Sequence, residues 1–169
     1  MINYRSALSE EHASLIDFLL DHGANPWNHL PIDGVMESFT TVGQGGGEVL
    51  LACDKSRVVG LCIFFYPNAL PKKYHQYTQS HPAVYISEVT VHRDYAGHGI
   101  GSELLRQTFA LVESLDAVMA LVDRHEENLA SAGMMRKAGF VELRTFEDLE
   151  RRDFGSRKTT VMGRHLNSD

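Results

Sequence analysis

Three alternating glycines, Gly97, Gly99 and Gly101, separate a strand-like segment from a segment with helical periodicity. Residues 85–91 are β-branched and aromatic, with apolar side chains on both parities, and apolar residues recur at helical spacing over residues 100–115. Glycines at such a junction let the backbone turn sharply and approach a ligand. Because the first N–H groups of a helix lack intrahelical partners, the junction predicts a phosphate site. The alternative is a tight turn whose glycines only satisfy backbone angles.

The spacing of these glycines excludes two common nucleotide sites. A dinucleotide-binding turn needs G-x-G-x-x-G, and Ser102 occupies the place of its third glycine. A P-loop needs Gly-Lys-Ser or Gly-Lys-Thr, which occurs nowhere in the sequence. A nucleotide-binding regulator that uses the same glycine turn stays open as a weaker alternative.

Two motifs resemble the GNAT superfamily of acyl-CoA-dependent N-acyltransferases. The central motif of that family is a strand followed by Arg/Gln-x-x-Gly-x-Gly/Ala, and here Ala96 replaces the first residue while the last two glycines match. This replacement removes one side-chain contact to pyrophosphate and leaves the backbone contacts. The second family motif, N-x-x-A/S-x-x-L-Y-x-K-x-G-F, is matched downstream by Asn128, Ser131, Met134, Lys137, Gly139 and Phe140. Two motifs in the right order are harder to obtain by chance than one.

The resemblance implies transfer of an acetyl group from acetyl-CoA to a primary amine of a small molecule or peptide. It places the pantetheine beside the backbone of Val89, Thr90 and Val91, with the N–H near Val89 facing the developing oxyanion. It places Asn128 near the cofactor arm. The pyrophosphate contacts that it implies are Ala96, Gly97, His98, Gly99, Ile100, Gly101 and Ser102.

Glu88 is the predicted general base, acting directly or through a water. The acceptor amine must lose a proton, because an alkylammonium with a pKa of about 10 is not nucleophilic. Glu88 shares its strand parity with Val84 and Ile86, so we expect a partly apolar environment that raises its pKa. The alternative is a carboxylate at the wet end of a strand. His92 is a weaker candidate for the base.

Met135 stands where the resemblance expects a tyrosine, the usual general acid. Methionine cannot donate a proton, which leaves open a catalytically degenerate acyl-CoA-binding or regulatory module. A thiol has a pKa of about 8.5, so the CoA thiolate leaves near neutral pH with little help. We therefore expect an active enzyme in which Met135 lies beside the CoA sulfur.

Composition and charge restrict the partners and the location. The 169 residues allow one domain, residues 1–169, and the net charge of −6 with no long basic cluster argues against nucleic acid. The N-terminus shows neither a signal peptide nor a membrane span, so we expect a cytoplasmic protein without membrane contact. Cys53 and Cys62 are expected to be small core residues, with a nucleophilic cysteine as the alternative. The histidines lack metal-ligand spacing, no metal is expected, and a homodimer is possible.

Periodicity and turn residues predict a single α/β (α+β) domain with the element order β-α-α-β-β-β-α-β-α-β-β. The resemblance implies the same fold, a mixed and mostly antiparallel sheet of six to seven strands with helices on both faces. Predicted strands cover residues 2–7, 48–53, 58–66, 85–91, 118–123, 140–146 and 158–162, and helices cover 9–23, 33–40, 100–115 and 128–138.

The connections carry further expectations. Ser9 is predicted to cap the first helix and Gly23 to close it in the left-handed conformation, and residues 43–47 are predicted to form a loop. The long connection 67–82 is either a surface loop or a lid over the acceptor. The histidines expected to lie exposed near the cofactor mouth are His92, His98 and His125.

Overall fold

The computed structural model describes residues 1–25, 27 and 31–166 and contains one seven-stranded sheet in the order β1-β2-β3-β4-β5-β7-β6. Neighbouring strands are antiparallel except β4 and β5, which are parallel. The strands are β1 (Ile2–Ser6), β2 (Gly47–Asp54), β3 (Arg57–Phe65), β4 (Ala83–Val91), β5 (Met119–His125), β6 (Val141–Glu147) and β7 (Lys158–His165). The mixed, mostly antiparallel sheet predicted from the sequence is confirmed.

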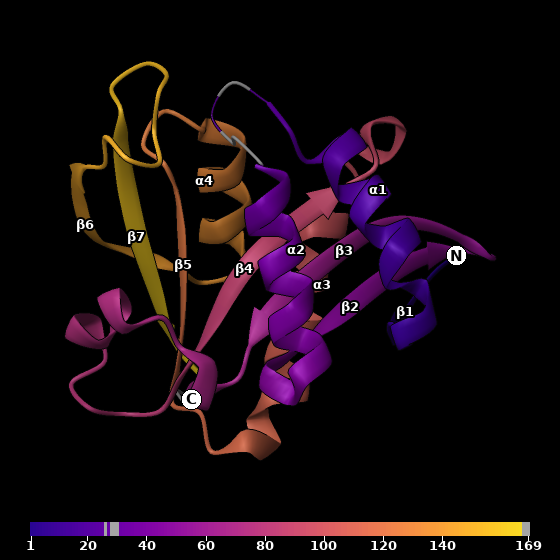
Figure 1. Ribbon diagram of the computed structural model, residues 1–169, viewed down its shortest axis with the longest axis horizontal. Coiled ribbons are helices and arrows are strands. Elements are labelled where there is room, and N and C mark those ends of the chain that lie inside the picture. Colours follow the sequence, from indigo (N-terminus) through magenta and orange to yellow (C-terminus); the bar gives the residue numbers. More distant parts are fainter. Residues whose placement is uncertain (26, 28–30, 167–169) are drawn as a thin grey trace.

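In the described part of the chain, four α-helices cover the two faces of this sheet (Figure 1). The helices are α1 (His12–His22), α2 (Ile32–Thr41), α3 (Ile100–Val112) and α4 (Leu129–Lys137). Side chains of α1 and α2 form one buried cluster with the sheet, and side chains of α3 and α4 form a second cluster on the opposite face. We call these the α1/α2 face and the α3/α4 face.

Helix α3 packs on the sheet through a stripe that includes Leu104, Leu105 and Val112, all fully buried. The apolar pattern over residues 100–115 also predicted Leu111 and Leu115 in this stripe, and there the prediction was wrong. Leu111, in the last turn of α3, and Leu115, in the 3-10 turn Glu113–Leu115 that follows, are 39% and 38% exposed.

The start of the first helical segment differs from the prediction. Ser9 does not cap it; the segment begins with a 3-10 turn after Leu8, whose backbone N–H donates to the Glu11 carboxylate at 2.8 Å. Glu11 also accepts from Arg5 at 2.7 Å, so one carboxylate ties the end of β1 to the helix. At the other end, Gly23 has φ −89°, which is not the left-handed conformation expected.

The glycine-rich segment after α2 is also more regular than a loop. Residues Val42–Gly46 continue α2 as a wide helical turn, and β2 begins at Gly47. Gly45 has φ 84°, a conformation that favours glycine, and it ends the helical path.

The connection 67–82 contains the 3-10 turns Pro67–Ala69 and Lys72–Tyr77. Tyr74 is only 2% exposed, because its ring enters the α1/α2 face and stacks on Tyr85 with the ring centroids 4.7 Å apart. The connection is therefore anchored to the core, and it does not lie loosely on the surface.

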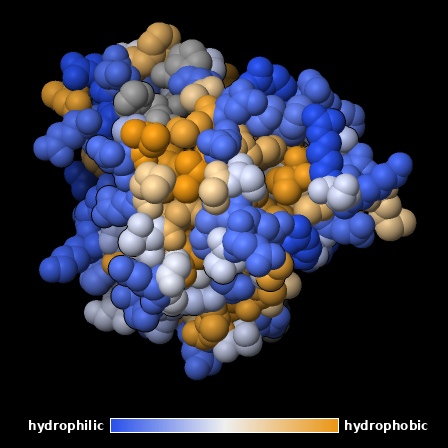
Figure 2. Space-filling view, turned by 45° about the vertical axis from the view of Figure 1, so that its right-hand side comes forward, coloured by the Kyte–Doolittle hydropathy of each residue, from blue (hydrophilic) through white to orange (hydrophobic). Residues whose placement is uncertain are grey.

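The surface shows where apolar side chains remain accessible. Figure 2 shows hydrophobic side chains gathered in the middle of the visible face, with hydrophilic side chains around them. On α2, Ile32 and Met36 are 59% and 47% exposed.

Over the residues that the structure describes, no helix is long and apolar enough to cross a membrane. The cytoplasmic location and the possible homodimer stay predictions.

Candidate active site

Strands β4 and β5 separate at the centre of the sheet. Their parallel pairing runs from Ala83 with Met119 to Ile86 with Val122, and beyond this point β4 stays paired only with β3. In Figure 1 the two strands diverge toward the end at which α3 and α4 begin. The separation exposes one edge of β4 over residues 87–91 to a ligand.

A β-bulge lies where the strands separate. Ile63 of β3 pairs with Glu88, but Phe64 pairs with Ile86, so Ser87 is an extra residue. Because a bulge shifts the alternation of side chains, Glu88 faces the α1/α2 side with Ile63, whereas Ile86 faces the α3/α4 side. The alternation of the sequence predicted Glu88 on the same face of the sheet as Val84 and Ile86, and this prediction is wrong. The raised pKa expected for Glu88 stays a prediction.

The backbone alternation of β4 places N–H groups at the open edge. The N–H of His92 donates to Val59 O of β3 at 2.8 Å. Since N–H groups alternate along a strand, those of Val89 and Val91 point away from β3, toward the separation. The side chain of Thr90 lies on the α1/α2 face of the sheet, because Thr90 pairs with Leu61, whose side chain is part of that core. Thr90 can therefore meet a ligand on the α3/α4 side only through its backbone.

The turn between β4 and α3 has the geometry predicted for an anion site. Gly97 and Gly99 have φ 82° and 78°, and a Cβ added at either would meet open space. Ala96 and His98 are also exposed, and Ser102 is half-buried. Within the described chain no side chain caps α3, so the N–H groups of its first turn are free to bind an anion.

Gly101 has a different role from its neighbours. It is buried next to Ile100, and a Cβ there would lie 2.4 Å from Met134 Sδ of α4. Gly101 therefore allows α3 and α4 to approach each other closely. Its predicted use, to let the backbone approach pyrophosphate, has less support than for Gly99.

Helix α4 brings Asn128 and Met135 to the same region. Asn128 caps α4, and its Oδ1 accepts from the N–H of Ser131 at 3.2 Å. This cap uses the amide oxygen, and the side chain also carries two N–H donors. Met135 is 4% exposed in the α3/α4 core, with its surface on the cleft described next.

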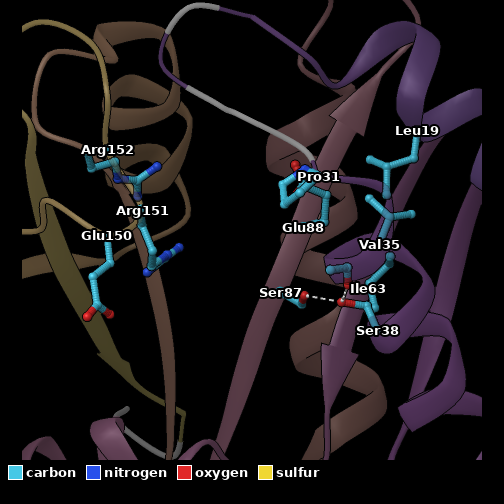
Figure 3. Close-up of a pocket in the computed structure, with 11 residues that line it drawn as sticks. Leu19, Pro31, Val35, Ser38, Ile63, Ser87, Glu88, Glu150, Arg151 and Arg152 are labelled. Carbon is cyan, nitrogen blue, oxygen red and sulfur yellow. Dashed lines mark hydrogen bonds between the residues drawn. The ribbon is translucent and has the colours of Figure 1, made fainter.

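Two cavities meet at the bulge. The larger, about 670 Å³, runs along the open edge of β4 to the first turns of α3 and α4. The smaller, about 250 Å³, lies against α1 and α2 and includes Leu19, Val35 and Ile63 (Figure 3). Among the described residues, Ser87, Glu88, Arg151 and Arg152 line both cavities. Ser87 is held by its Oγ, 3.3 Å from Ser38 Oγ of α2.

Arg151 and Arg152 were not selected from the sequence, where they read as one short basic cluster. Both lie in residues 148–157, which we call the β6–β7 connection. Arg151 makes a two-pronged ion pair with Asp123 of β5, at 3.0 and 3.1 Å. Asp123 also accepts hydrogen bonds from the hydroxyls of Tyr74 and Tyr85. Burial alone would raise the pKa of Asp123, but Arg151, Tyr74 and Arg152 outweigh it and hold that pKa at about 2.

The β6–β7 connection is fixed to the end of β5. His125 Nε2–H donates to Phe154 O at 2.7 Å, and its Nδ1 accepts from Glu127 N–H at 3.0 Å. The Glu127 carboxylate in turn accepts from Ser156 N–H. His125 is 2% exposed, so the predicted exposure at the cofactor mouth was wrong for this residue. Its two nitrogens instead hold the loop that carries Arg151.

His92 is also buried, at 8% exposure, against prediction. Arg57 Nη2 lies 2.8 Å from its Nε2, Asp94 N–H donates to its Nδ1, and the His22 ring lies 4.0 Å away between centroids. With both nitrogens engaged, His92 is poorly placed as a general base. His98 is exposed, as predicted.

The two cysteines lie away from the cavities. Cys53 and Cys62 are 4% and 0% exposed. Burial raises the pKa of the Cys62 thiol to about 12, and Thr108 donates to its sulfur. Such a thiol is a poor nucleophile. In the part of the chain that the structure covers, no group of three or more His, Cys, Asp or Glu is placed to hold a metal ion.

Comparison with known proteins agrees with this geometry. A sequence model of the acetyltransferase (GNAT) family matches residues 13–140. The chain therefore belongs to the acetyltransferase (GNAT) family, and the predicted enzyme class, an acyl-CoA-dependent N-acetyltransferase, is confirmed. No curated protein shows significant similarity to the chain.

Solved structures share the fold at low sequence identity. Arabidopsis thaliana NAA60 in complex with acetyl-CoA has a TM-score of 0.77 and 15% identity, over 99% of this chain and all of that one (100%). YncA from Salmonella typhimurium with its cofactor acetyl-CoA has a TM-score of 0.74 and 18% identity, over 100% and 96% of the two chains. The N-acetyltransferase from Staphylococcus aureus Mu50 has a TM-score of 0.75 and 16% identity, over 99% of each chain. Two of the three were solved with acetyl-CoA, the predicted cosubstrate.

Proposed function

We propose that this protein transfers an acetyl group directly from acetyl-CoA to a primary amine of a small molecule. The observation that carries the proposal is the meeting of two cavities at the β4 bulge, where Glu88 lines both. A cosubstrate in the larger cavity and an amine in the smaller one would approach each other at this residue. The volume of the smaller cavity, about 250 Å³, favours a small acceptor over a peptide.

The larger cavity suits the cosubstrate because backbone donors face it at the open edge of β4 and at the start of α3. Acetyl-CoA supplies an acetyl group activated as a thioester. The exposed turn from Ala96 to Gly99 and the first N–H groups of α3 suit its pyrophosphate. The N–H groups of Val89 and Val91 would lie beside its path, and that of Val89 would donate to the thioester carbonyl. Asn128 contributes amide donors from the start of α4.

Glu88 is the proposed general base. Its position at the bulge places a carboxylate between the cavities, where the amine must lose its proton before it attacks. Ser87 is held by Ser38, which helps to fix the backbone that carries Glu88.

No proton donor is assigned near Met135, and the reaction does not require one. The thiol leaves as a thiolate that is stable near neutral pH, and the positive end of α3 favours an anion nearby. Met135 lines the larger cavity, as expected for a residue beside the sulfur. The same methionine favours the second candidate, a module that binds acyl-CoA without turnover.

The test is acetyl-CoA consumption by the wild-type protein over a panel of primary amines, with mass spectrometry of the products. We expect at least one small amine to be N-acetylated and free CoA to be released in equal amount. Tight binding of acetyl-CoA with no acetylated amine would contradict the proposal and favour the binding module. Stabilisation by ATP in place of acetyl-CoA would favour the nucleotide-binding alternative.

A further inference from the structure

The smaller cavity has two unlike walls. Figure 3 shows Ser87 and Glu88 on β4, and Arg151 and Arg152 projecting toward that strand from the β6–β7 connection. Glu150, which also lines the cavity, is exposed and turns its carboxylate away from β4. One wall therefore presents a carboxylate and the other presents guanidinium groups.

Arg151 is the accessible cation of this wall. Arg152 is 7% exposed, and its donors are used by Thr159 Oγ1 at 2.8 Å, Trp27 O at 3.3 Å and Asp123 at 3.5 Å. Arg151 and Arg152 share Asp123. The Asp148 carboxylate also lies 3.7 Å from Arg151 Nη1, so two carboxylates balance the two guanidinium groups. The Arg151 side chain is 37% exposed.

The guanidinium of Arg151 is held in place and keeps donors for a ligand. Its two terminal nitrogens donate to Asp123 and, at 3.4 Å, to the Tyr74 hydroxyl, while a guanidinium has five N–H groups. Asp123 is itself fixed by Tyr74 and Tyr85, which stack on each other. A rigid, partly exposed guanidinium with unused donors is well suited to bind an oxyanion.

We propose that the acceptor is a small amino compound that also carries an oxyanion, such as a carboxylate, and that Arg151 binds this anion while the amine lies at Glu88. This rests on the proposed function and specifies its substrate class. In Figure 3 the apolar side chains of Leu19, Val35 and Ile63 lie on the far side of Glu88 from Arg151, so they would contact a side chain of the acceptor beyond its amine. The dipole of the cavity matches the dipole of an amino acid and would disfavour a diamine.

The alternative for Arg151 is a purely structural ion pair that joins the β6–β7 connection to β5. A structural role predicts equal losses with all acceptors when Arg151 is changed. A binding role predicts a loss confined to acceptors with an anion. Acceptor series that differ only in this group therefore separate the two roles.

The first experiment needs no variant. Initial rates of the wild-type protein are compared for L-amino acids, their aminophosphonate analogues, their carboxamides and the corresponding decarboxylated amines. We expect kcat/KM to be roughly 10- to 100-fold higher for an anionic acceptor than for its carboxamide, the usual value of a hydrogen bond to a charged group. The phosphonate arm shows whether the site prefers a planar or a tetrahedral anion.

Two failures are distinguishable in this comparison. Acetylation of neutral amines or diamines as well as amino acids would overturn this inference and leave the proposed function intact. Binding of acetyl-CoA with no acetylation of any acceptor would overturn both.

The second experiment compares Arg151→Gln and Arg151→Lys with Arg106→Gln, an exposed arginine of α3 paired with Glu103 outside both cavities. On the best amino acid, Arg151→Gln should raise KM roughly 10- to 100-fold, Arg151→Lys less, and Arg106→Gln not at all. The KM for acetyl-CoA and the rate with the carboxamide should stay near wild type. Equal losses on the amino acid and its carboxamide would show that Arg151 is structural. If Arg151→Gln does not fold, Arg151→Lys and the wild-type comparison still decide.

Discussion

The two sides of β4 differ in how their residues are distributed along the chain. The proposed contacts of the cosubstrate come from β4, the turn after it and the starts of α3 and α4, and their geometry follows from local backbone rules, although the end of β5 also lines this cavity. The proposed acceptor side combines Leu19, Val35, Glu88 and Arg151, which the fold brings together from distant segments. A shared cosubstrate can therefore be recognised from a short motif, whereas the acceptor depends on tertiary structure.

Changing the residue at the boundary between the two sides should have the largest effect. Glu88→Gln removes the proposed base and should lower kcat by roughly 10²- to 10⁴-fold, the usual contribution of general base catalysis. The acidic limb of the pH-rate profile should disappear, and the dissociation constant for acetyl-CoA should stay near that of wild type. Steady-state kinetics and calorimetric titration measure these quantities. An unchanged rate on the correct amine would assign deprotonation to solvent.

The cosubstrate side can be disrupted alone with Gly99→Val. The variant places a side chain in the open space above the turn and should weaken acetyl-CoA binding by roughly 10²-fold, through lost hydrogen bonds to a charged group. Gly45→Val is a matched control, because Gly45 also has a positive φ (84°) and open space. It should show a similar loss of stability, about 1–3 kcal/mol, and no loss of binding. Equal acetyl-CoA affinity in the two variants would contradict the proposed pyrophosphate site.

Measuring both stability and acetyl-CoA binding also distinguishes the role of Gly101 from that of Gly99. Because a side chain at Gly101 must displace the flexible side chain of Met134, Gly101→Val should destabilise the fold by about 1 kcal/mol. Denaturant unfolding measures this. If the Gly101→Val variant is as stable as wild type but no longer binds acetyl-CoA, Gly101 contacts the pyrophosphate as the sequence predicted.

For the ion pair that holds Arg151, Asp123→Asn should destabilise the fold by about 3 kcal/mol at neutral pH, because Arg151 and Arg152 lose their buried carboxylate. The pKa of Asp123 is about 2 in the folded protein, below the unfolded value of about 3.9. The ionised carboxylate therefore stabilises the fold fully above about pH 3.9, and this contribution is lost as the pH falls toward 2. The gap between wild type and variant should therefore narrow in acid. Unfolding free energies at several pH values test this, with exposed Glu113→Gln as the control. A gap that stays constant with pH would contradict the ion-pair explanation.

The smallest effect is expected at Met135. Met135→Tyr adds a phenol beside the proposed position of the CoA sulfur and should change kcat by less than roughly 10²-fold, because a thiolate needs little protonation to leave. Single-turnover rates with the best amine measure the change. The account would be contradicted if the wild-type protein binds acetyl-CoA but acetylates no amine, while Met135→Tyr is active. The protein would then be an acyl-CoA-binding module that has lost its catalytic activity.

The sequence predicted the elements and the turn before α3, since periodicity, glycine spacing and helix geometry are local properties. It failed where tertiary contacts decide. The bulge at Ser87 reversed the expected side of Glu88, and a bulge has no clear signature in a strand of mixed apolar residues. His92 and His125 were expected in solvent, but their ring nitrogens bind partners from other segments. Arg151 gave no signal, because its partner Asp123 is far away in sequence.

The central claim is that both substrates occupy the protein together, one on each side of the bulge, and react without an acetylated enzyme. Initial-rate kinetics with both substrates varied test this most directly. We predict double-reciprocal lines that intersect, as for a ternary complex, and no acetyl group on the protein after incubation with acetyl-CoA alone. Parallel lines together with a stoichiometric acetyl-enzyme would contradict the account, because they require a nucleophile that buried Cys53 and Cys62 do not provide.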